Sequence, residues 1–277
     1  MRRAACLCLG LVALLSVSSE LAATASAVPK VSISARSFVA IDADSGRVLI
    51  AHASTVRRPI ASLTKIMTAL LVIERGQLQA PVRVTPAATR VEPEREGLIS
   101  GQSYSRMTLL WSSLLVSSND SATALAIDAG GGSLNRFYTL MNIKARSLGM
   151  TQTTYASASG LNDTRNLSTA LDQATLARAA LTNSTFAHIV ATRVHRTSWA
   201  APVYAKVWVN HNKMLMTTPG TYGVKTGWTT RAGGCLIVAE RRGSRAVIGV
   251  ILDSPSIWVD GPNLIDDAFA RMSSLRS

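Results

Sequence analysis

The sequence predicts an α/β fold in which strands from both ends of the chain form one antiparallel sheet with a helical subdomain inserted between them. Period-two and continuous apolar runs occur near both ends, and the residues between them place apolar side chains at helical spacing. The chain has 277 residues, of which 47% are apolar and 16% charged. This composition supplies a large buried core and excludes an intrinsically disordered protein.

The N-terminal residues carry the pattern of a secretory signal peptide. Two arginines precede an apolar run over residues 4–17, and small residues follow at 25–27. The apolar run is shorter than the ~20 residues that a membrane-spanning helix needs. We therefore expect residues 1–27 to be a cleaved signal peptide and residues 28–277 to be one exported domain.

The first predicted elements of the mature chain are a hairpin and a helix. Apolar residues at 38–41 and 48–50 flank an Asp-, Ser- and Gly-rich turn, which predicts two strands. Apolar side chains at helical spacing then predict a buried helix from Ser62 to Arg75, with Gly76 as its stop. The same reading predicts further helices over residues 107–115, 121–129, 134–148 and 169–181.

Strands return after Tyr222. Apolar runs at 235–239 and 246–252 are joined by a plausible turn at 241–244, and an amphipathic helix at 264–272 follows. These strands complete the sheet begun by the N-terminal hairpin. The middle of the chain then emerges from that sheet as the helical subdomain.

The charge and the cysteine and histidine content exclude several classes of site. The formal net charge is +13, or +12 after removal of residues 1–27, but the basic residues are scattered without interleaved aromatics. We expect no nucleic-acid partner and instead electrostatic contact with anionic envelope polymers or a membrane surface. Cys235 is the only cysteine of the mature chain, and the four histidines lack ligand spacing, so we expect neither a disulfide nor a metal site.

Ser62-Leu63-Thr64-Lys65 is an SxxK sequence at the predicted start of a helix. The spacing places the serine hydroxyl and the lysine amine on one face, one turn apart. Lys65 can act as the base for Ser62 only if burial or nearby positive charge lowers its pKa. About one such match is expected by chance in this chain, and a turn of a surface helix is the alternative interpretation.

Two SxN sequences and one KTG sequence follow. Ser133-Leu134-Asn135 is better interpreted as a helix cap, which leaves Ser117-Ser118-Asn119 as the candidate site. Lys225-Thr226-Gly227 is expected only about 0.03 times by chance and enters a predicted strand. The lysine and threonine side chains of this motif can bind an anionic group, and its glycine lets a ligand lie against the strand. A surface lysine at a turn is the alternative interpretation.

The order SxxK, SxN, KTG and the residues around each motif resemble the low-molecular-mass D-alanyl-D-alanine carboxypeptidases of the S11 serine peptidase family, which are penicillin-binding proteins. The resemblance runs from about Phe38 to Met272 and implies a β-lactamase/transpeptidase-like fold. It is carried also by Ser159-Gly160-Leu161, Leu167-Ser168-Thr169-Ala170 and the Trp228-Thr229 that follows KTG.

The resemblance implies roles for the residues of the first two motifs. Ser62 would attack the bond between the terminal D-alanines of a peptidoglycan stem peptide, forming an acyl-enzyme that β-lactams would trap. Lys65 would be the base, Ser117 would relay a proton to the leaving amine, and Asn119 would bind the substrate amide. The site of action would be the periplasm or cell-wall space outside the cytoplasmic membrane.

The resemblance also assigns the KTG strand to substrate binding. Lys225 and Thr226 would bind the substrate carboxylate, with Gly227 beside it. The backbone N–H groups of Ser62 and Trp228 would form the oxyanion hole, and no metal or organic cofactor is implied.

Two departures from the family pattern stand out. Many members carry an arginine near the carboxylate site where this chain has Asn210-His211-Asn212, so either His211 takes a weaker share or the partner lies elsewhere. The chain ends about 50 residues after KTG, which predicts a single domain without the additional β-domain and membrane-binding tail of many relatives.

Three alternatives share some of these features. A class A β-lactamase uses a glutamate between SxN and KTG, but no glutamate lies between Asn119 and Lys225. A D,D-endopeptidase that cuts peptidoglycan cross-links uses the same machinery and remains open. A non-catalytic stem-peptide-binding protein would normally have lost Ser62 or Lys65, and both are present.

Overall fold

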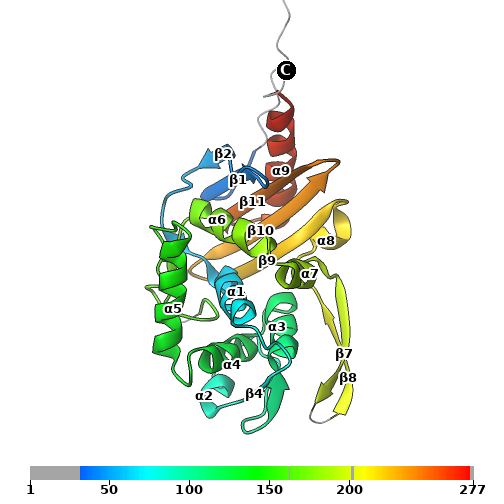
Figure 1. Cartoon of the computed structure of the whole chain (residues 1–277). Coiled ribbons are helices and arrows are strands. Elements are labelled where there is room, and N and C mark those ends of the chain that lie inside the picture. The colour runs from blue at the N-terminus through cyan, green and yellow to red at the C-terminus, as the bar shows by residue number, and fades with distance from the viewer. Residues whose placement is uncertain (1–31, 162, 201–202, 275–277) are drawn as a thin grey trace, which may run out of the picture.

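The computed structural model describes residues 32–161, 163–200 and 203–274, so the predicted signal peptide lies outside the described residues. Its main sheet is antiparallel, with the strand order β2-β1-β11-β10-β9 (Figure 1). Strand β1 from the start of the chain pairs with β11 from its end, which confirms the predicted joining of the two ends. The strands are β1 (Ser37–Asp42), β2 (Val48–His52), β9 (Thr221–Thr229), β10 (Gly233–Arg242) and β11 (Arg245–Ser254).

Successive side chains of the central strands point to opposite faces of the sheet and so belong to two separate cores. Leu236 and Val238 of β10 pack with Leu264 and Phe269 of α9 (Ile257–Ser274) on one face of the sheet. Ile237 and its neighbours of the same parity belong to the larger core on the other face. Because side chains of a strand point alternately to opposite faces, the continuous apolar runs at the chain end are those of strands buried on both sides.

The larger core is shared with the predicted helical subdomain, which the structure confirms. Most of its helices begin at a serine, threonine or asparagine whose side-chain oxygen accepts a hydrogen bond from a backbone N–H of the first turn, including the predicted cap Ser133. The helices are α1 (Lys65–Arg75), α2 (Pro86–Thr89), α3 (Arg106–Leu115), α4 (Asn119–Ala129), α5 (Leu134–Ser147), α6 (Ala170–Leu181), α7 (Ser184–Ala191) and α8 (Met214–Thr217).

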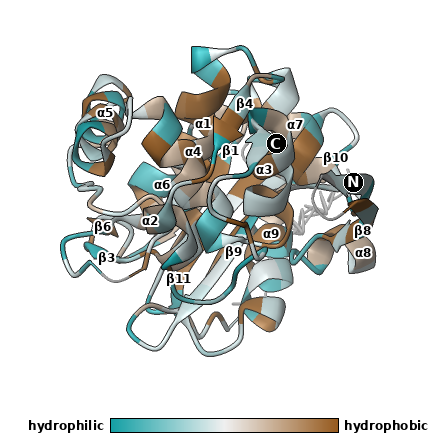
Figure 2. Ribbon diagram, turned by 90° about the horizontal axis from the view of Figure 1, so that it is seen from below, coloured by the Kyte–Doolittle hydropathy of each residue, from teal (hydrophilic) through white to brown (hydrophobic). Residues whose placement is uncertain are grey.

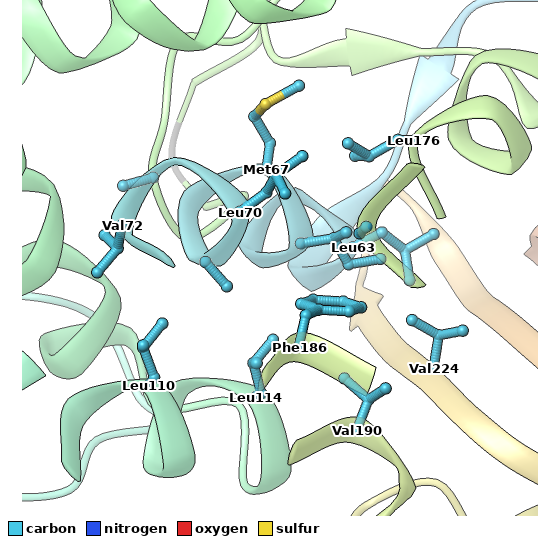
Figure 3. Packing of buried hydrophobic residues seen from close by; sticks show 14 of the residues in the cluster. Leu63, Met67, Leu70, Val72, Leu110, Leu114, Leu176, Phe186, Val190 and Val224 are labelled. Atoms are coloured by element: carbon cyan, nitrogen blue, oxygen red, sulfur yellow. The ribbon is translucent and has the colours of Figure 1, made fainter. Parts of the chain in front are cut away.

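Helix α1 lies at the centre of this packing. Figure 2 shows hydrophobic residues concentrated in α1 and more hydrophilic ones towards the peripheral helix α5. In Figure 3, Leu63 lies above Phe186 of α7, with Leu176 of α6 and Val224 of β9 close by. All four side chains are buried. This packing fixes the segment that carries Ser62 between the sheet and the helices.

The structure differs from the sequence expectations in two respects. The predicted helix from Ser62 to Arg75 is a 3₁₀ helix, η1 (Ala61–Thr64), followed by α1, because Ala61 enters the turn with a positive φ of 46°. The middle of the chain also contains a β-hairpin formed by β7 (Val194–Ala200) and β8 (Val203–Val209), which the helical interpretation missed. Two-stranded pairings of β3 (Arg58–Pro59) with β6 (Leu167–Ser168) and of β4 (Pro81–Arg83) with β5 (Ser103–Ser105) complete the fold.

Candidate active site

Ser62 lies in η1 at the junction of the sheet and the helical subdomain. Ser62 is 9% exposed and lines a cleft of about 1470 Å³. Ser117, Thr226, Gly227 and Trp228 line the same cleft. The three sequence motifs, far apart along the chain, are therefore brought to one place by the fold.

Lys65, the first residue of α1, is fully buried and makes three hydrogen-bond contacts through Nζ. These join it to Ser62 Oγ at 2.8 Å, Asn119 Oδ1 at 2.7 Å and the Ser159 carbonyl oxygen at 3.0 Å. The amide and carbonyl oxygens can only accept. A neutral amine therefore donates its two N–H groups to them and directs its lone pair at the Ser62 hydroxyl, which is the arrangement a general base requires.

The surroundings of Lys65 favour that neutral amine. Burial lowers the pKa of Lys65 well below the usual lysine value, and the positive charge of Lys225 lowers it further. The carboxylate of Glu94 acts in the opposite direction. Burial and a neighbouring cation are the two influences that the sequence analysis required for Lys65 to act as a base.

The orientation of Asn119 is fixed by the segment that precedes the SxN motif. Its Nδ2 donates to the Glu92 carbonyl oxygen at 3.0 Å and its backbone N–H donates to the Glu94 carbonyl oxygen at 2.9 Å. Since Nδ2 has an acceptor on one side, Oδ1 is left to face the lysine. Asn119 thus holds Lys65 in the free protein.

A buried carboxylate holds the same segment in place. Asp120 accepts hydrogen bonds from the backbone N–H groups of Glu96 and Gly97 at 2.9 Å each and of Leu98 at 3.0 Å, and also from the Ser118 hydroxyl. Farther out, the Glu96 carboxylate pairs with Lys206 and accepts from Trp208 Nε1 at 2.9 Å. The loop bearing Glu92 and Glu94 is therefore anchored at the wall of the cleft.

Ser117 occupies the turn between α3 and α4 with a φ of 62°, in the left-handed region that non-glycine residues seldom adopt. The turn places Ser117 on the cleft wall with 8% of its surface exposed. Backbone strain of this kind clusters at functional sites.

The KTG residues lie within β9, the outer strand of the five-stranded sheet, which leaves one side of the strand free of sheet pairing. A Cβ at Gly227 would lie 2.8 Å from the Ser62 backbone nitrogen. No other residue type fits there without moving the strand away from η1. The glycine is thus required by the close approach of β9 to the backbone of Ser62.

Lys225 is buried, and its Nζ donates to the Thr226 carbonyl oxygen at 3.1 Å. Burial lowers the pKa of Lys225 to about 7, and the Glu94 carboxylate partly opposes the fall. A buried amine of this kind gains most from an incoming anion, because the anion supplies the charge partner that burial removed.

Trp228 and His211 also lie at the cleft. Trp228 is 68% exposed at its rim. His211 lines the cleft, and its pKa is lowered first by burial and then by the positive charge of Lys225. A neutral imidazole offers a hydrogen bond rather than a charge, so His211 is not an electrostatic substitute for the family arginine.

The sequence analysis assigned no role to three residues that shape the site. Ser159 holds Lys65 through its carbonyl oxygen, and Gly160 has a φ of 91° and would place a Cβ 1.8 Å from the Ala61 carbonyl oxygen. Both were visible only as part of the resemblance. The carbonyl contact of Ser159 leaves no mark in residue type, whereas the close approach at Gly160 is marked by the glycine itself. Glu94 had no signal, because its segment carries no motif.

Within the described ranges, no three His, Cys, Asp or Glu residues come together as metal ligands would. Over the same part of the chain, no helix combines the length and the hydropathy of a membrane span.

Comparisons with known proteins agree with this site. Residues 22–256 match the family model of the S11 peptidases, described as D-alanyl-D-alanine carboxypeptidase. The chain is 33% identical to a D-alanyl-D-alanine carboxypeptidase of Streptomyces sp. (strain K15) over 93% of this chain and 94% of that protein. It is 30% identical to a D-alanyl-D-alanine endopeptidase of Escherichia coli over 86% of this chain and 77% of that protein.

Solved structures give the same result. The Streptomyces K15 DD-transpeptidase superimposes with a TM-score of 0.83 at 32% identity, covering 88% of this chain and 100% of that one. A D-alanyl-D-alanine carboxypeptidase from Mycobacterium tuberculosis gives 0.82 at 33% identity, covering 89% and 95%. With its SxxK, SxN and KTG residues gathered at one cleft, the chain belongs to the S11 family of D-alanyl-D-alanine carboxypeptidases.

Proposed function

We propose that this protein is a serine D,D-carboxypeptidase that removes the terminal D-alanine from peptidoglycan stem pentapeptides through an acyl-enzyme on Ser62. The observation that carries the proposal is the contact set of Lys65 Nζ, which directs a buried amine of lowered pKa at the Ser62 hydroxyl 2.8 Å away. Family membership supplies the substrate class.

In the proposed acylation, Lys65 Nζ takes the hydroxyl proton as Ser62 Oγ bonds to the carbonyl carbon between the two D-alanines. The resulting oxyanion accepts hydrogen bonds from the backbone N–H groups of Ser62 and Trp228. The proton taken up by Lys65 passes through the Ser117 hydroxyl to the leaving nitrogen, the C–N bond breaks and D-alanine departs. Each oxyanion donor of this kind contributes about 3 to 4 kcal/mol to transition-state stability.

Substrate binding is assigned to the edge strand and to the SxN asparagine. Lys225 and Thr226 bind the terminal carboxylate, Gly227 leaves room beside them, and Asn119 binds the substrate amide. His211 contributes a hydrogen bond near the carboxylate. Water then enters where D-alanine left and hydrolyses the Ser62 ester, which completes turnover without a metal or organic cofactor.

The decisive test is intact mass spectrometry after incubation with benzylpenicillin. We expect one covalent penicilloyl adduct per protein molecule, because the strained amide of the antibiotic resembles the scissile bond and its carboxylate reaches Lys225. Ser62→Ala should abolish the adduct, whereas Ser147→Ala, which removes an exposed hydroxyl of α5, should label fully. Full labelling of Ser62→Ala would show that the nucleophile is another residue.

A D,D-endopeptidase is the second candidate, since relatives at 30% to 33% identity include endopeptidases. Parallel assays with a stem pentapeptide and with a cross-linked dimer distinguish the two activities. Faster release of free D-alanine from the pentapeptide supports the carboxypeptidase. Faster cleavage of the dimer supports the endopeptidase, with the same Ser62 chemistry.

We further propose that residues 1–27 direct export and are removed, leaving a single domain in the periplasm or cell-wall space. The basic, apolar and small-residue order of that segment supports the proposal. Sequencing the N-terminus of the mature protein should give Val28. An intact Met1 on the exported protein would show that the apolar run is retained.

A further inference from the structure

The β7–β8 hairpin has two chemically different faces. Its register pairs His195 with Trp208 and Trp199 with Tyr204, and this set of side chains faces the helices. Trp199 and Trp208 are buried, and the His195 ring stacks on Trp111 of α3 with centroids 3.9 Å apart. The inner face therefore fixes the hairpin firmly on the helical subdomain.

The opposite face carries a row of uncovered valines. Val203 is 82% exposed, Val207 49% and Val209 52%, and Val209 lies opposite Val194, which is 40% exposed. Because every second residue of a strand points the same way, these side chains form one stripe along the hairpin. The hairpin itself lies at the side of the molecule in Figure 1. We call this stripe the outer valine face. Contiguous exposed apolar patches on a folded domain mark interaction surfaces.

The exposed charge on the outer valine face itself is positive. Arg196 lies opposite Val207 on the same face and is exposed. In the sequence, no acidic residue occurs between Asp172 and Glu240. In the hairpin and the residue before it, Arg193 and Arg196 are exposed, whereas Lys206 lies on the inner face and pairs with Glu96.

We propose that the outer valine face docks on the surface of an anionic phospholipid bilayer. The valines enter the boundary between headgroups and acyl chains, and Arg196 and Arg193 contact lipid phosphates. Hydrophilic anionic polymers match the charge but offer no apolar phase for the valines. A second copy of the hairpin matches the valines but brings Arg196 close to a like charge.

Vesicle co-sedimentation tests the proposal. The mature protein is mixed with vesicles of phosphatidylcholine alone or with 30% phosphatidylglycerol. The triple variant Val203→Thr, Val207→Thr, Val209→Thr keeps side-chain shape and β-propensity while replacing methyl groups with hydroxyls. The control variant Val48→Thr, Val56→Thr, Val259→Thr makes the same change at exposed valines outside the hairpin.

We expect strong binding only to the anionic vesicles, a partition coefficient about tenfold or more lower for the hairpin triple variant, and little change for the control. Arg196→Gln should weaken binding at low salt and matter less at high salt. Equal binding of the two triple variants, or equal binding to both lipid compositions, would overturn the proposal. A concentration-dependent dimer that only the hairpin variant loses would overturn it in favour of self-association.

Thermal unfolding keeps these outcomes interpretable, because a variant with an unchanged melting temperature has kept its fold. Penicillin labelling is independent of lipid. Loss of vesicle binding with full labelling concerns the hairpin alone, and loss of labelling with full vesicle binding concerns the active site alone.

Discussion

The two lysines of the site, both buried, are placed for different tasks. Lys65 Nζ contacts the Ser62 hydroxyl, whereas Lys225 lies on the edge strand without a carboxylate among its hydrogen-bond partners in the described residues. Lys65→Ala should lower the acylation rate at saturating penicillin by at least about a hundredfold, as loss of a general base does. Lys225→Ala should instead chiefly raise the penicillin concentration needed for half-maximal rate.

Rapid-quench kinetics over a range of penicillin concentrations separates the two effects, with circular dichroism as the control for folding. If both variants lose saturating acylation equally and completely, the proposed division of roles is wrong.

The lowered pKa of Lys225 predicts a pH-dependent substrate affinity. With a pKa of about 7 in the free protein, the amine is charged below this pH and loses its charge as the pH rises through it. KM for a D-Ala-D-Ala peptide should therefore rise above about pH 7. Lys225→Arg keeps its charge at all these pH values, so its KM should be nearly flat between pH 6 and 9 even if it is higher throughout.

Secondary-structure elements hold the site residues in position, and the N-terminus of α4 is the clearest case. Asp120 joins that helix to the loop that orients Asn119. Asp120→Asn replaces one acceptor oxygen with an N–H₂ group that faces backbone donors. We expect a loss of about 2 to 3 kcal/mol of unfolding free energy.

The same variant should acylate more slowly, because Asn119 would lose part of the support that fixes its amide. Urea denaturation and penicillin labelling measure the two effects. Asp128→Asn, at the salt bridge with Arg106 near the other end of α4, is the matched control. Its stability should fall while its acylation rate is kept, and equal slowing in both variants would indicate a general effect of weakened folding.

Element types were predictable where one kind of periodicity dominates. The strands buried on both faces and the helices with Ser or Thr caps follow directly from residue pattern. The β7–β8 hairpin was not predicted, because its inner face is built from tryptophan and histidine rather than aliphatic residues. Its outer face is apolar as well, so the sequence does not alternate clearly between apolar and polar residues. The motif residues were found by type, whereas Ser159 holds Lys65 through its backbone carbonyl oxygen, which residue type does not report.

On the scale of the whole molecule, the absence of a glutamate between Asn119 and Lys225 predicts the fate of the acyl-enzyme. We expect deacylation to use the groups already engaged in acylation. A peptidyl ester leaves room for water once D-alanine departs, whereas a penicilloyl ester keeps its leaving nitrogen tethered in that space. We expect release of D-alanine from peptides together with a penicillin adduct that lasts minutes or longer.

Both reactions can be followed on one preparation, by D-alanine oxidase coupling and by intact mass. Rapid multiple-turnover hydrolysis of penicillin would contradict the prediction. So would a long-lived ester with the D-Ala-D-Ala peptide.

The pairing of β1 with β11 also governs when activity can arise during synthesis. Ser62 is synthesised early. Strand β9, which lies against it, is synthesised much later, and so are β10 and β11, which join β9 to β1 in the sheet. A nascent chain lacking β10 and β11 has no completed sheet to fold on, because non-local strand pairing needs both partners. The polypeptide should thus stay inert until these strands have been made, so penicillin capture reports on completed folding as well as on catalysis.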